Sequence, residues 1–326
     1  MAGFAHAPFN AAFVHTVCLA FPASPVSFAA MPSHLAVVRE ILADHAPEIE
    51  RKIAWVETPE PSGEGLRSRW SWSWKALKGV FATEGTILFT SMSRMQLFQA
   101  KRLLPHRGVE ASVVLHGDLE EILSTPRERF PMSLFSISKV LRSRTPKGLR
   151  YLLLGRSILE NVPSEFKELI ENSRIIDHPY HFADEPLSPA GPILFGTFGN
   201  TGDGRDLEAV ARGLKARRPE TRFRLIGFLA DADAVGRLGP VIEGARDAPL
   251  PRAEYLAQAG EVTHALWIAK PGGFRLRASG TFFDALAFAT PLVYTHNPYI
   301  DGYLAEAPEI GWACRDPDEV VAKIES

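Results

Sequence analysis

The chain has 326 residues, of which 46% are hydrophobic and 23% charged, a globular composition that excludes a disordered, collagen-like or coiled-coil chain. Its 36 basic and 38 acidic side chains leave a formal charge of −2, which excludes a uniformly basic nucleic-acid-binding protein. The two cysteines, Cys18 and Cys314, lie near opposite ends with no CxxC pattern, so we expect neither a disulfide framework nor a structural zinc site. No stretch approaches the roughly 20 apolar residues that span a bilayer, and the apolar N-terminus lacks the basic start of a signal peptide. We therefore expect a cytoplasmic protein.

In the first half of the chain, short apolar runs alternate with amphipathic stretches, a pattern typical of α/β proteins with parallel sheets. The predicted helices cover residues 34–42 and 92–103, and Asp118 is expected to begin another. The predicted strands are 12–17, 53–56, 86–90, 113–115, 150–154 and 174–176.

Residues 182–192 interrupt this alternation with three prolines and no periodicity, which predicts a linker. Beyond it, the predicted strands are 193–197, 223–228, 263–268 and 291–294. A helix is predicted with Leu207, Val210, Ala211 and Leu214 on one face, and another at 281–289. We predict an N-terminal domain over residues 1–183, a linker over 184–192 and a C-terminal domain over 193–326.

A glycine-rich turn follows the first strand of the second half and leads into a helix. Such turns let backbone N–H groups approach a phosphate at the helix N-terminus. The spacing is GxxGxxG rather than GxGxxG, and no acidic residue closes the next strand, so a dinucleotide dehydrogenase fits poorly. A tight turn without a ligand is the structural alternative. The candidate ligand-binding residues of this turn are Gly196, Thr197, Gly199 and Asn200.

A second segment combines cations with a predicted helix start. Lys270, Arg275 and Arg277 precede the Ser279-Gly280-Thr281 turn, and together they predict an anion-binding site. Asp284, in the first turns of the helix, can accept hydrogen bonds from hydroxyl groups. The simpler interpretation is that Ser279 only caps the helix and Asp284 complements its dipole, which leaves the cations unexplained.

Residues 277–293 resemble the donor-binding segment of GT-B glycosyltransferases, which commonly reads Ser-Gly, then an acid, Ala, Gly and Pro-Val. The glycine-rich turn at 196–204 is similar to the start of the C-terminal domain of those enzymes. The resemblance implies an α/β protein of the GT-B type, with two Rossmann-like domains whose parallel sheets face a central cleft. It implies a nucleotide diphosphate sugar as donor, no metal and no cofactor. By position, Ser279, Gly280 and Thr281 would contact the diphosphate and Asp284 the ribose or sugar hydroxyls.

The chain departs from the family at one notable position. Many retaining members carry two glutamates in an E-x7-E pattern, whereas the corresponding residues here are Leu276 and Asp284. This difference leaves the choice between inversion and retention open. A nucleotide-sugar epimerase of the same fold, or a scaffold that binds sugar nucleotides without catalysis, are the alternatives to a glycosyltransferase.

An inverting transferase needs a general base, which the family layout puts at the strand ends of the N-terminal domain. His116 and Asp118 follow a predicted strand and are the first candidates, with His15 and Glu57 next. As a structural alternative, His116 is a hydrogen-bonded turn residue and Asp118 a helix cap. His178 and His181 are candidates for lining the cleft, but two histidines do not make a metal site.

A tryptophan-rich basic segment precedes the second predicted helix. Indole and basic side chains together suit the headgroup region of an anionic membrane, and residues 132–150 add further cations. We therefore expect a saccharide or lipid-linked acceptor in polysaccharide biosynthesis, at the inner face of the cell membrane. A half-buried strand, or stacking on single-stranded nucleic acid, are the alternatives, and the family resemblance argues against a nucleic-acid partner. The residues in question are Arg67, Arg69, Trp70, Trp72, Trp74, Lys75 and Lys78.

Overall fold

The computed structural model describes residues 6–60, 63, 65–124, 130–182, 191–202, 204–270 and 272–325. The chain divides into two compact units, the first comprising residues 1–181 with 276–278, and the second 182–275 with 279–326. Most of the predicted linker, namely residues 184–190, lies outside the described residues.

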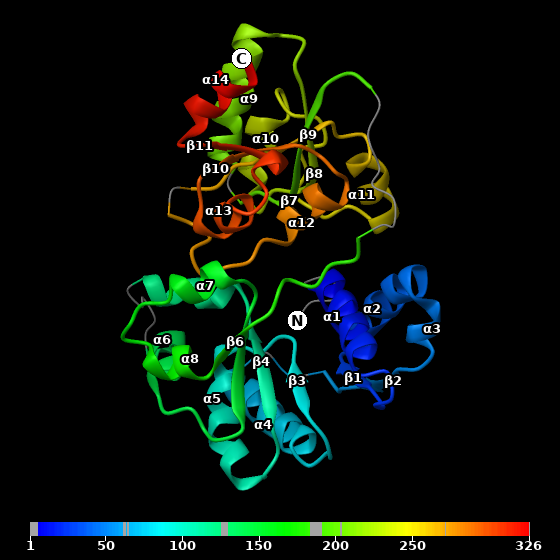
Figure 1. The fold of residues 1–326 in the computed structure, drawn as a ribbon, viewed down its shortest axis with the longest axis vertical. Helices are drawn as coiled ribbons and strands as arrows, with labels where there is room; N and C mark the ends of the chain where they lie inside the picture. Colours follow the sequence, from blue (N-terminus) through cyan, green and yellow to red (C-terminus); the bar gives the residue numbers. More distant parts are fainter. Residues whose placement is uncertain are drawn as a thin grey trace. The chain divides into compact units, whose positions relative to one another are not determined.

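The first unit contains two parallel sheets (Figure 1). Strands β1 (Ser27–Ala30) and β2 (Ala54–Glu57) form a pair. The larger sheet has the order β3-β4-β5-β6, with β3 (Ile87–Phe89), β4 (Ala111–Leu115), β5 (Leu149–Leu153) and β6 (Ser173–Ile175). The helices of the unit are α1 (Ala7–Ala20), α2 (Pro32–His45), α3 (Pro47–Glu50), α4 (Leu66–Val80), α5 (Arg94–Leu103), α6 (Ile137–Arg142), α7 (Arg156–Glu160) and α8 (Lys167–Glu171). The 3-10 helices are η1 (Leu104–His106), η2 (Gly117–Leu123) and η3 (Met132–Phe135).

The predicted strand at 12–17 is wrong, because these residues lie inside helix α1. Pro8 occupies the first turn of the helix, where the missing N–H costs no hydrogen bond. Ala7, Ala11 and Val14 recur at helical spacing and pack in one core with α2, β1 and β2. A short apolar run fits both a strand and a buried helix. Here the apolar residues repeat at helical spacing over a longer stretch, which indicates the helix.

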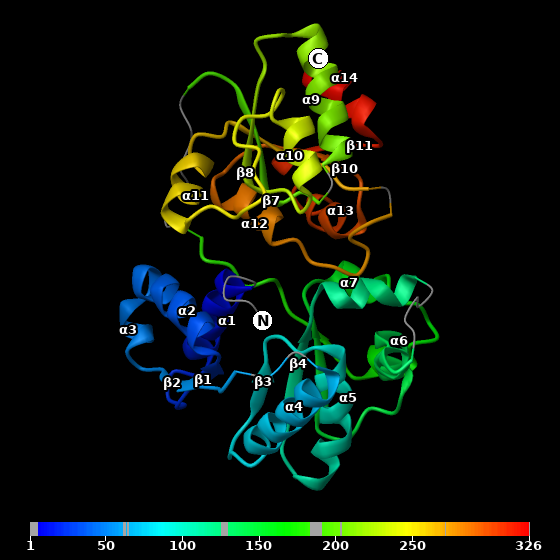
Figure 2. The same cartoon turned by 180° about the vertical axis from the view of Figure 1, so that it is seen from behind.

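The second unit contains a five-stranded parallel sheet of order β11-β10-β9-β7-β8, whose strands are all labelled in Figure 1 and whose other side is seen in Figure 2. Its strands are β7 (Leu194–Asn200), β8 (Arg222–Phe228), β9 (His264–Trp267), β10 (Leu292–Thr295) and β11 (Gly311–Cys314). Its helices are α9 (Arg205–Arg217), α10 (Ala232–Leu238), α11 (Arg252–Ala259), α12 (Gly280–Ala287), α13 (Pro298–Leu304) and α14 (Pro317–Glu325), with η4 (Pro308–Ile310). The chain proceeds from β7 to β8 on one side and returns to β9 on the other, so the strand order reverses between β7 and β9.

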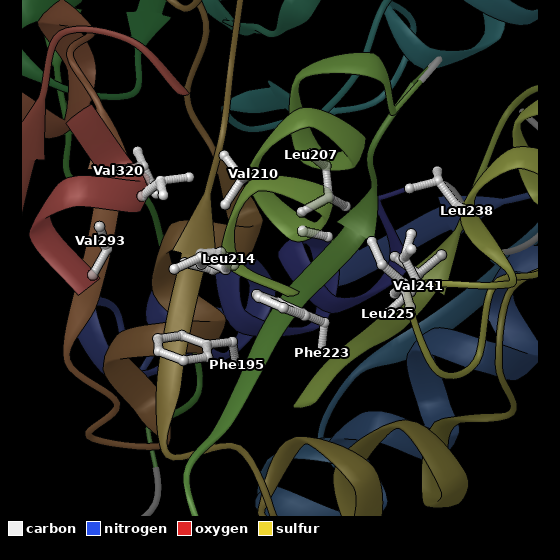
Figure 3. Close-up of a cluster of buried hydrophobic side chains, with 14 of the residues drawn as sticks. Phe195, Leu207, Val210, Leu214, Phe223, Leu225, Leu238, Val241, Val293 and Val320 are labelled. Atoms are coloured by element: carbon white, nitrogen blue, oxygen red, sulfur yellow. The ribbon is translucent and has the colours of Figure 1, made fainter. Parts of the chain in front are cut away.

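Side-chain alternation gives this sheet two different faces. On one face, Phe195 and Phe223 stack with ring centroids 5.6 Å apart and form one core with Leu214 of α9 and Val320 of α14 (Figure 3). The four predicted residues of α9 are all buried there, which confirms the helical pattern. The opposite face carries polar and aromatic side chains, and this face meets α11, α12 and α13.

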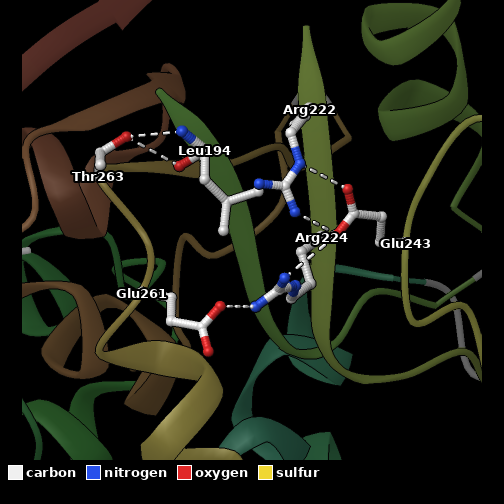
Figure 4. Close-up of polar contacts among 6 residues, drawn as sticks. All are labelled: Leu194, Arg222, Arg224, Glu243, Glu261 and Thr263. Atoms are coloured by element: carbon white, nitrogen blue, oxygen red, sulfur yellow. Dashed lines mark hydrogen bonds and ion pairs between the residues drawn. The ribbon is translucent and has the colours of Figure 1, made fainter. Parts of the chain in front are cut away.

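Ionic contacts hold the outer strand β8, and hydroxyl contacts hold the start of its neighbour β7 (Figure 4). Arg222 Nε and Arg224 Nη2 lie 2.9 and 3.2 Å from the carboxylate of Glu243. Thr263 Oγ1 bonds both the N–H and the C=O of Leu194, at 2.8 and 3.1 Å, and so secures the start of β7. The Thr263 contacts satisfy the two backbone groups of Leu194 at the start of β7.

Candidate functional site

The glycine-rich turn at the end of β7 requires glycine at specific positions. Gly199 has φ +72, and a Cβ on it would lie 2.4 Å from Cγ2 of Thr281. The backbone of β8 also approaches this turn closely, because a Cβ on Gly227 would lie 2.0 Å from the Gly199 carbonyl oxygen. Within the turn, the Gly202 N–H donates to Asn200 Oδ1 at 2.9 Å. The turn therefore packs directly against the beginning of α12.

Two of the predicted residues of this turn have a packing role in the structure. Gly196 and Thr197 lie inside β7 and are buried. A Cβ on Gly196 would lie 2.4 Å from Val262, so its small size permits close packing of the sheet. Of the four predicted residues, Gly199 and Asn200 are the two that lie at the C-terminal end of β7.

The Ser-Gly-Thr turn begins helix α12 as predicted. Ser279 is the N-cap and its Oγ accepts from the Phe282 N–H at 3.3 Å. Trp267, at the end of β9, donates its indole N–H to Ser279 Oγ at 3.0 Å and to Thr281 Oγ1 at 3.2 Å. Gly280 is the first residue of the helix and is exposed. Sequence reasoning missed Trp267, because nothing in the chain marks which strand end will face the helix.

Asp284 lies one turn further along α12 and already has a hydroxyl partner. Its Oδ2 accepts from the hydroxyl of Tyr255 on α11 at 2.6 Å. Tyr255 also packs near Phe198 of β7, with ring centroids 6.5 Å apart. The carboxylate thus accepts a hydrogen bond from a hydroxyl of the protein itself, whereas its predicted bond to ribose or sugar hydroxyls stays a prediction.

The three predicted cations, Lys270, Arg275 and Arg277, are all exposed. Arg277 belongs to the short stretch 276–278 that groups with the first unit. Within that unit, the Leu276 N–H donates to Glu120 Oε2 at 2.7 Å. Leu276, which stands where many retaining enzymes have glutamate, is fully buried.

In the first unit, His116 follows β4 and belongs to a cluster of aromatic rings. Its Nε2 lies 2.6 Å from the Thr90 carbonyl oxygen, so this nitrogen carries the hydrogen. Its ring lies 4.4 Å from that of His6 and 4.8 Å from that of Phe9. Phe9 in turn meets His178 at 5.1 Å. Burial lowers the pKa of His116 and of His178 to about 4, so both imidazoles are neutral near pH 7.

Asp118 is exposed in the first turn of η2. Burial lowers the pKa of His6, whereas the Asp118 carboxylate opposes this effect. The sequence analysis does not identify His6 and Phe9, because they lie more than 100 residues from His116 and belong to no predicted motif.

The other predicted histidines lie apart from this cluster. His15 Nδ1 lies 3.1 Å from His181 Nε2, and the ring of His45 stacks on that of His181 at 4.7 Å. Glu57 is exposed at the end of β2. Within the described ranges, no group of three or more His, Cys, Asp or Glu side chains is arranged to hold a metal ion.

The sequence matches no protein-family model, and no curated protein is significantly similar to it. Solved structures do match. A glycosyltransferase from Rickettsia africae ESF-5 aligns with 99% of this chain and 84% of its own, at 10% identity and a TM-score of 0.58. The lipopolysaccharide outer core galactosyltransferase WaaB aligns with 100% of this chain and 92% of its own, at 10% identity and a TM-score of 0.55. Arabidopsis thaliana UGT89C1, solved with UDP-L-rhamnose, aligns with 97% of this chain and 85% of its own, at 11% identity and a TM-score of 0.52.

The chain has the GT-B fold. This confirms the fold class predicted from the donor-segment resemblance and from the alternation of strands and helices. In the second unit of this GT-B protein, the Gly199 turn and the start of α12 meet where the strand order reverses. Ligands of open α/β sheets bind in that position, beyond the carboxyl ends of the strands.

The tryptophan segment of this GT-B protein is helix α4, not a strand. Trp70 and Trp74 stack with centroids 6.0 Å apart, and Trp70 packs on Phe135 at 5.5 Å. Trp72 donates its indole N–H to the Pro59 carbonyl oxygen at 2.8 Å. The indoles therefore contribute to internal packing. The cations of the segment, Arg67, Arg69, Lys75 and Lys78, are exposed. Among the described helices, none has both the length and the apolar character to cross a membrane.

Proposed function

We propose that this protein is a glycosyltransferase that moves a sugar from a nucleotide diphosphate sugar to an acceptor hydroxyl. The observation that carries the proposal is the packing of the Gly199 turn against Thr281 at the start of α12, at the strand-order reversal of a GT-B fold. Similar structures were solved with UDP-L-rhamnose, in UGT89C1, and with ADP, in starch synthase IV. The second unit is proposed to bind the donor and the first to bind the acceptor.

In the proposed reaction, the acceptor oxygen forms a bond to the anomeric carbon while the bond to the nucleotide diphosphate breaks. The leaving diphosphate is stabilised by the backbone N–H groups of Ser279–Thr281, by the Thr281 hydroxyl and by Lys270, Arg275 and Arg277. Asp284 accepts hydrogen bonds from the ribose or sugar hydroxyls. No step requires a metal, because cationic side chains and a helix N-terminus supply the charge stabilisation.

The acceptor proton is proposed to go to Asp118 or His116 in the first unit. For His116, the hydrogen on Nε2 is directed to Thr90, which leaves Nδ1 as the basic nitrogen. A pKa near 4 makes this imidazole a weak base at neutral pH, and the exposed Asp118 carboxylate is then the first candidate.

Donor binding is the first test, by isothermal titration of UDP, ADP and GDP sugars. We expect Arg277→Ala to weaken binding of the preferred donor by about 10- to 100-fold, the equivalent of one charge-assisted hydrogen bond. Arg51→Ala, a change of another exposed arginine on a different element, is the matched control and should bind normally. Unchanged donor affinity in Arg277→Ala would remove this residue from the site.

Transfer is the second test. Loss of a general base costs about 10²–10⁴ in rate, so Asp118→Asn should reduce kcat by that factor without changing donor affinity. If Asp118→Asn and His116→Ala both retain normal rates, the base lies elsewhere or the mechanism is retaining. Turnover of the free sugar nucleotide without an acceptor would instead indicate an epimerase. Binding without transfer or hydrolysis would indicate an inactive scaffold.

We further propose that the acceptor is a saccharide, lipid-linked in polysaccharide biosynthesis, met at the inner face of the cell membrane. The exposed cations of α4 support this proposal, as does the fold similarity to an outer core galactosyltransferase. Each basic residue near an anionic surface contributes about 1 kcal/mol. Binding to phosphatidylglycerol vesicles should be lost at high salt, and also in a variant with Arg67, Arg69, Lys75 and Lys78 changed to glutamine. Equal sedimentation with neutral vesicles would contradict docking.

A further inference from the structure

Three side chains at the start of α12 form a closed polar triangle. The Trp267 indole N–H lies 3.0 Å from Ser279 Oγ and 3.2 Å from Thr281 Oγ1, and the two hydroxyl oxygens are 3.0 Å apart. Trp267 and Ser279 are buried, at 8% and 4% exposed. Buried polar groups are held in defined partnerships, so the direction of each hydrogen bond can be worked out.

The direction follows from counting donors and acceptors. An indole nitrogen only donates, and a hydroxyl has one hydrogen and two lone pairs. The single indole hydrogen of Trp267 is shared between Ser279 Oγ and Thr281 Oγ1. Ser279 Oγ accepts this shared hydrogen and the Phe282 N–H, which occupies both of its lone pairs. Its own hydrogen must therefore be donated to Thr281 Oγ1. Thr281 Oγ1 accepts from Ser279 and from Trp267, so its own hydrogen points away from the triangle.

The remaining freedom of Thr281 is removed by its methyl group. Cγ2 packs against the Cα of Gly199, where a Cβ would approach to 2.4 Å. The methyl contact and the two accepted hydrogen bonds fix the rotamer together. Two residues beyond Gly199, the Thr201 hydroxyl is buried and lacks a hydrogen-bond partner among the described residues. A buried hydroxyl without a partner is costly, and a bound ligand would satisfy it.

We propose that Trp267 is a positioning residue that makes Thr281 a hydrogen-bond donor to a phosphate oxygen of the bound nucleoside diphosphate. The inference rests on the proposed donor site. Phosphate oxygens only accept, so a hydroxyl that is forced to donate is pre-organised for them. Without the indole N–H, each hydroxyl oxygen has a lone pair without a donor. Thr281 can then donate its hydrogen to Ser279 Oγ instead of to a ligand.

The test is a double-mutant cycle with UDP, ADP and GDP as probes, measured by isothermal titration on the full chain. Trp267→Phe keeps an aromatic ring and removes the N–H, whereas Thr281→Val keeps the shape and removes the hydroxyl. We expect each change to weaken binding of the preferred diphosphate about five- to tenfold. In the Thr281→Val background, Trp267→Phe should have no further effect, because both changes remove the same hydrogen bond. Tyr294→Phe, which removes a hydroxyl bonded to Asp301 on the same sheet face, is the control and should bind normally.

Losses that multiply in the double variant would show that Trp267 acts through general packing, for instance against the Phe274 ring at 4.6 Å, and would overturn the inference. Unchanged affinity in Trp267→Phe would also overturn it while leaving the donor site intact. If the unmodified protein binds none of the three diphosphates, the proposed function itself fails, and the inference fails with it.

Discussion

The polar side chains that follow the strands differ in chemical type between the two units. In the first unit, the groups that follow β4 and β6 are imidazoles, half-buried among aromatic rings and held neutral. In the second unit, the groups beyond β7 and β9 are hydroxyls, an indole N–H and the first turn of a helix. Desolvated imidazoles disfavour added charge, whereas oriented N–H and O–H groups attract an anion. One fold pattern, used twice, thus gives two chemically different strand ends.

The neutral histidines should give the first unit a steep acid sensitivity, the largest effect that we expect. The pKa of His116 is about 4 in the folded protein, against an ordinary value of 6.5. Between these values the unfolded chain binds a proton that the folded chain does not, so the free energy of unfolding falls as the pH falls. For His116 the loss from pH 6.5 to pH 4 is about 2–3 kcal/mol.

Urea unfolding of the protein and of His116→Phe at pH 7, 6, 5 and 4.5 measures this effect. The phenylalanine variant should lose less stability on acidification, whereas His106→Gln, an exposed histidine on η1, should behave like the unmodified protein. Parallel pH profiles for all three proteins would show that His116 is already charged when folded.

The close packing of Gly199, at the end of β7, against Thr281 predicts the next largest effect. Gly199→Ala forces a side chain into a backbone at φ +72 and against the Thr281 methyl, and should destabilise the protein by about 2 kcal/mol. Adding Thr281→Ser removes the methyl and should restore part of that loss, though not the part due to φ. Chemical denaturation of the single and double variants checks this. If the changes in the free energy of unfolding of the two single variants simply add in the double variant, the two residues do not touch.

A smaller effect is expected at Asp284. Tyr255→Phe removes a hydroxyl donor 2.6 Å from this carboxylate and should lower the free energy of unfolding by about 1 kcal/mol. If Asp284 binds the donor through hydroxyl groups, the variant should also change the apparent KM for the sugar nucleotide more than kcat. Thermal unfolding and donor kinetics measure the two effects, and an exposed change such as Leu256→Ala serves as the control.

The smallest effect is expected at Glu243, which pairs with Arg222 and Arg224 of the outer strand β8. Hydrogen bonds from Arg222, and then from Arg224, lower the pKa of Glu243. Its carboxylate therefore stabilises the folded protein above its ordinary pKa near 4.5, and this contribution is lost as the pH falls through the lower folded value. The Glu243 side chain is 42% exposed, so after screening Glu243→Gln should cost about 0.5 kcal/mol at pH 7. Denaturation at pH 7 and at low pH, with and without 1 M salt, checks this.

Sequence patterns were sufficient where a residue's local neighbours decide its structure. The α9 face, four of the five strands of the second unit and the Ser279 cap were predictable, because burial on one face and capping act within a few residues. The fifth strand, β11, was not predicted. The resemblance of residues 277–293 to the donor-binding segment of GT-B glycosyltransferases was also visible, since the residue types that carry it lie close together in the chain. The same reasoning failed at α1, where a six-residue apolar run fits either a strand or a helix.

The sequence alone determined the α/β class, the parallel sheets and the place of the helix start that is predicted to bind an anion, because these depend on periodicity and on neighbouring residues. Only the tertiary structure decided which distant groups meet. It brought His6 and Phe9 to His116, Trp267 to Ser279, Tyr255 to Asp284 and Gly199 to Thr281. The pKa of His116 likewise depends on burial by residues far away in the chain. Desolvation and close contact are properties of three-dimensional packing, and the order of residues along a chain does not specify them locally.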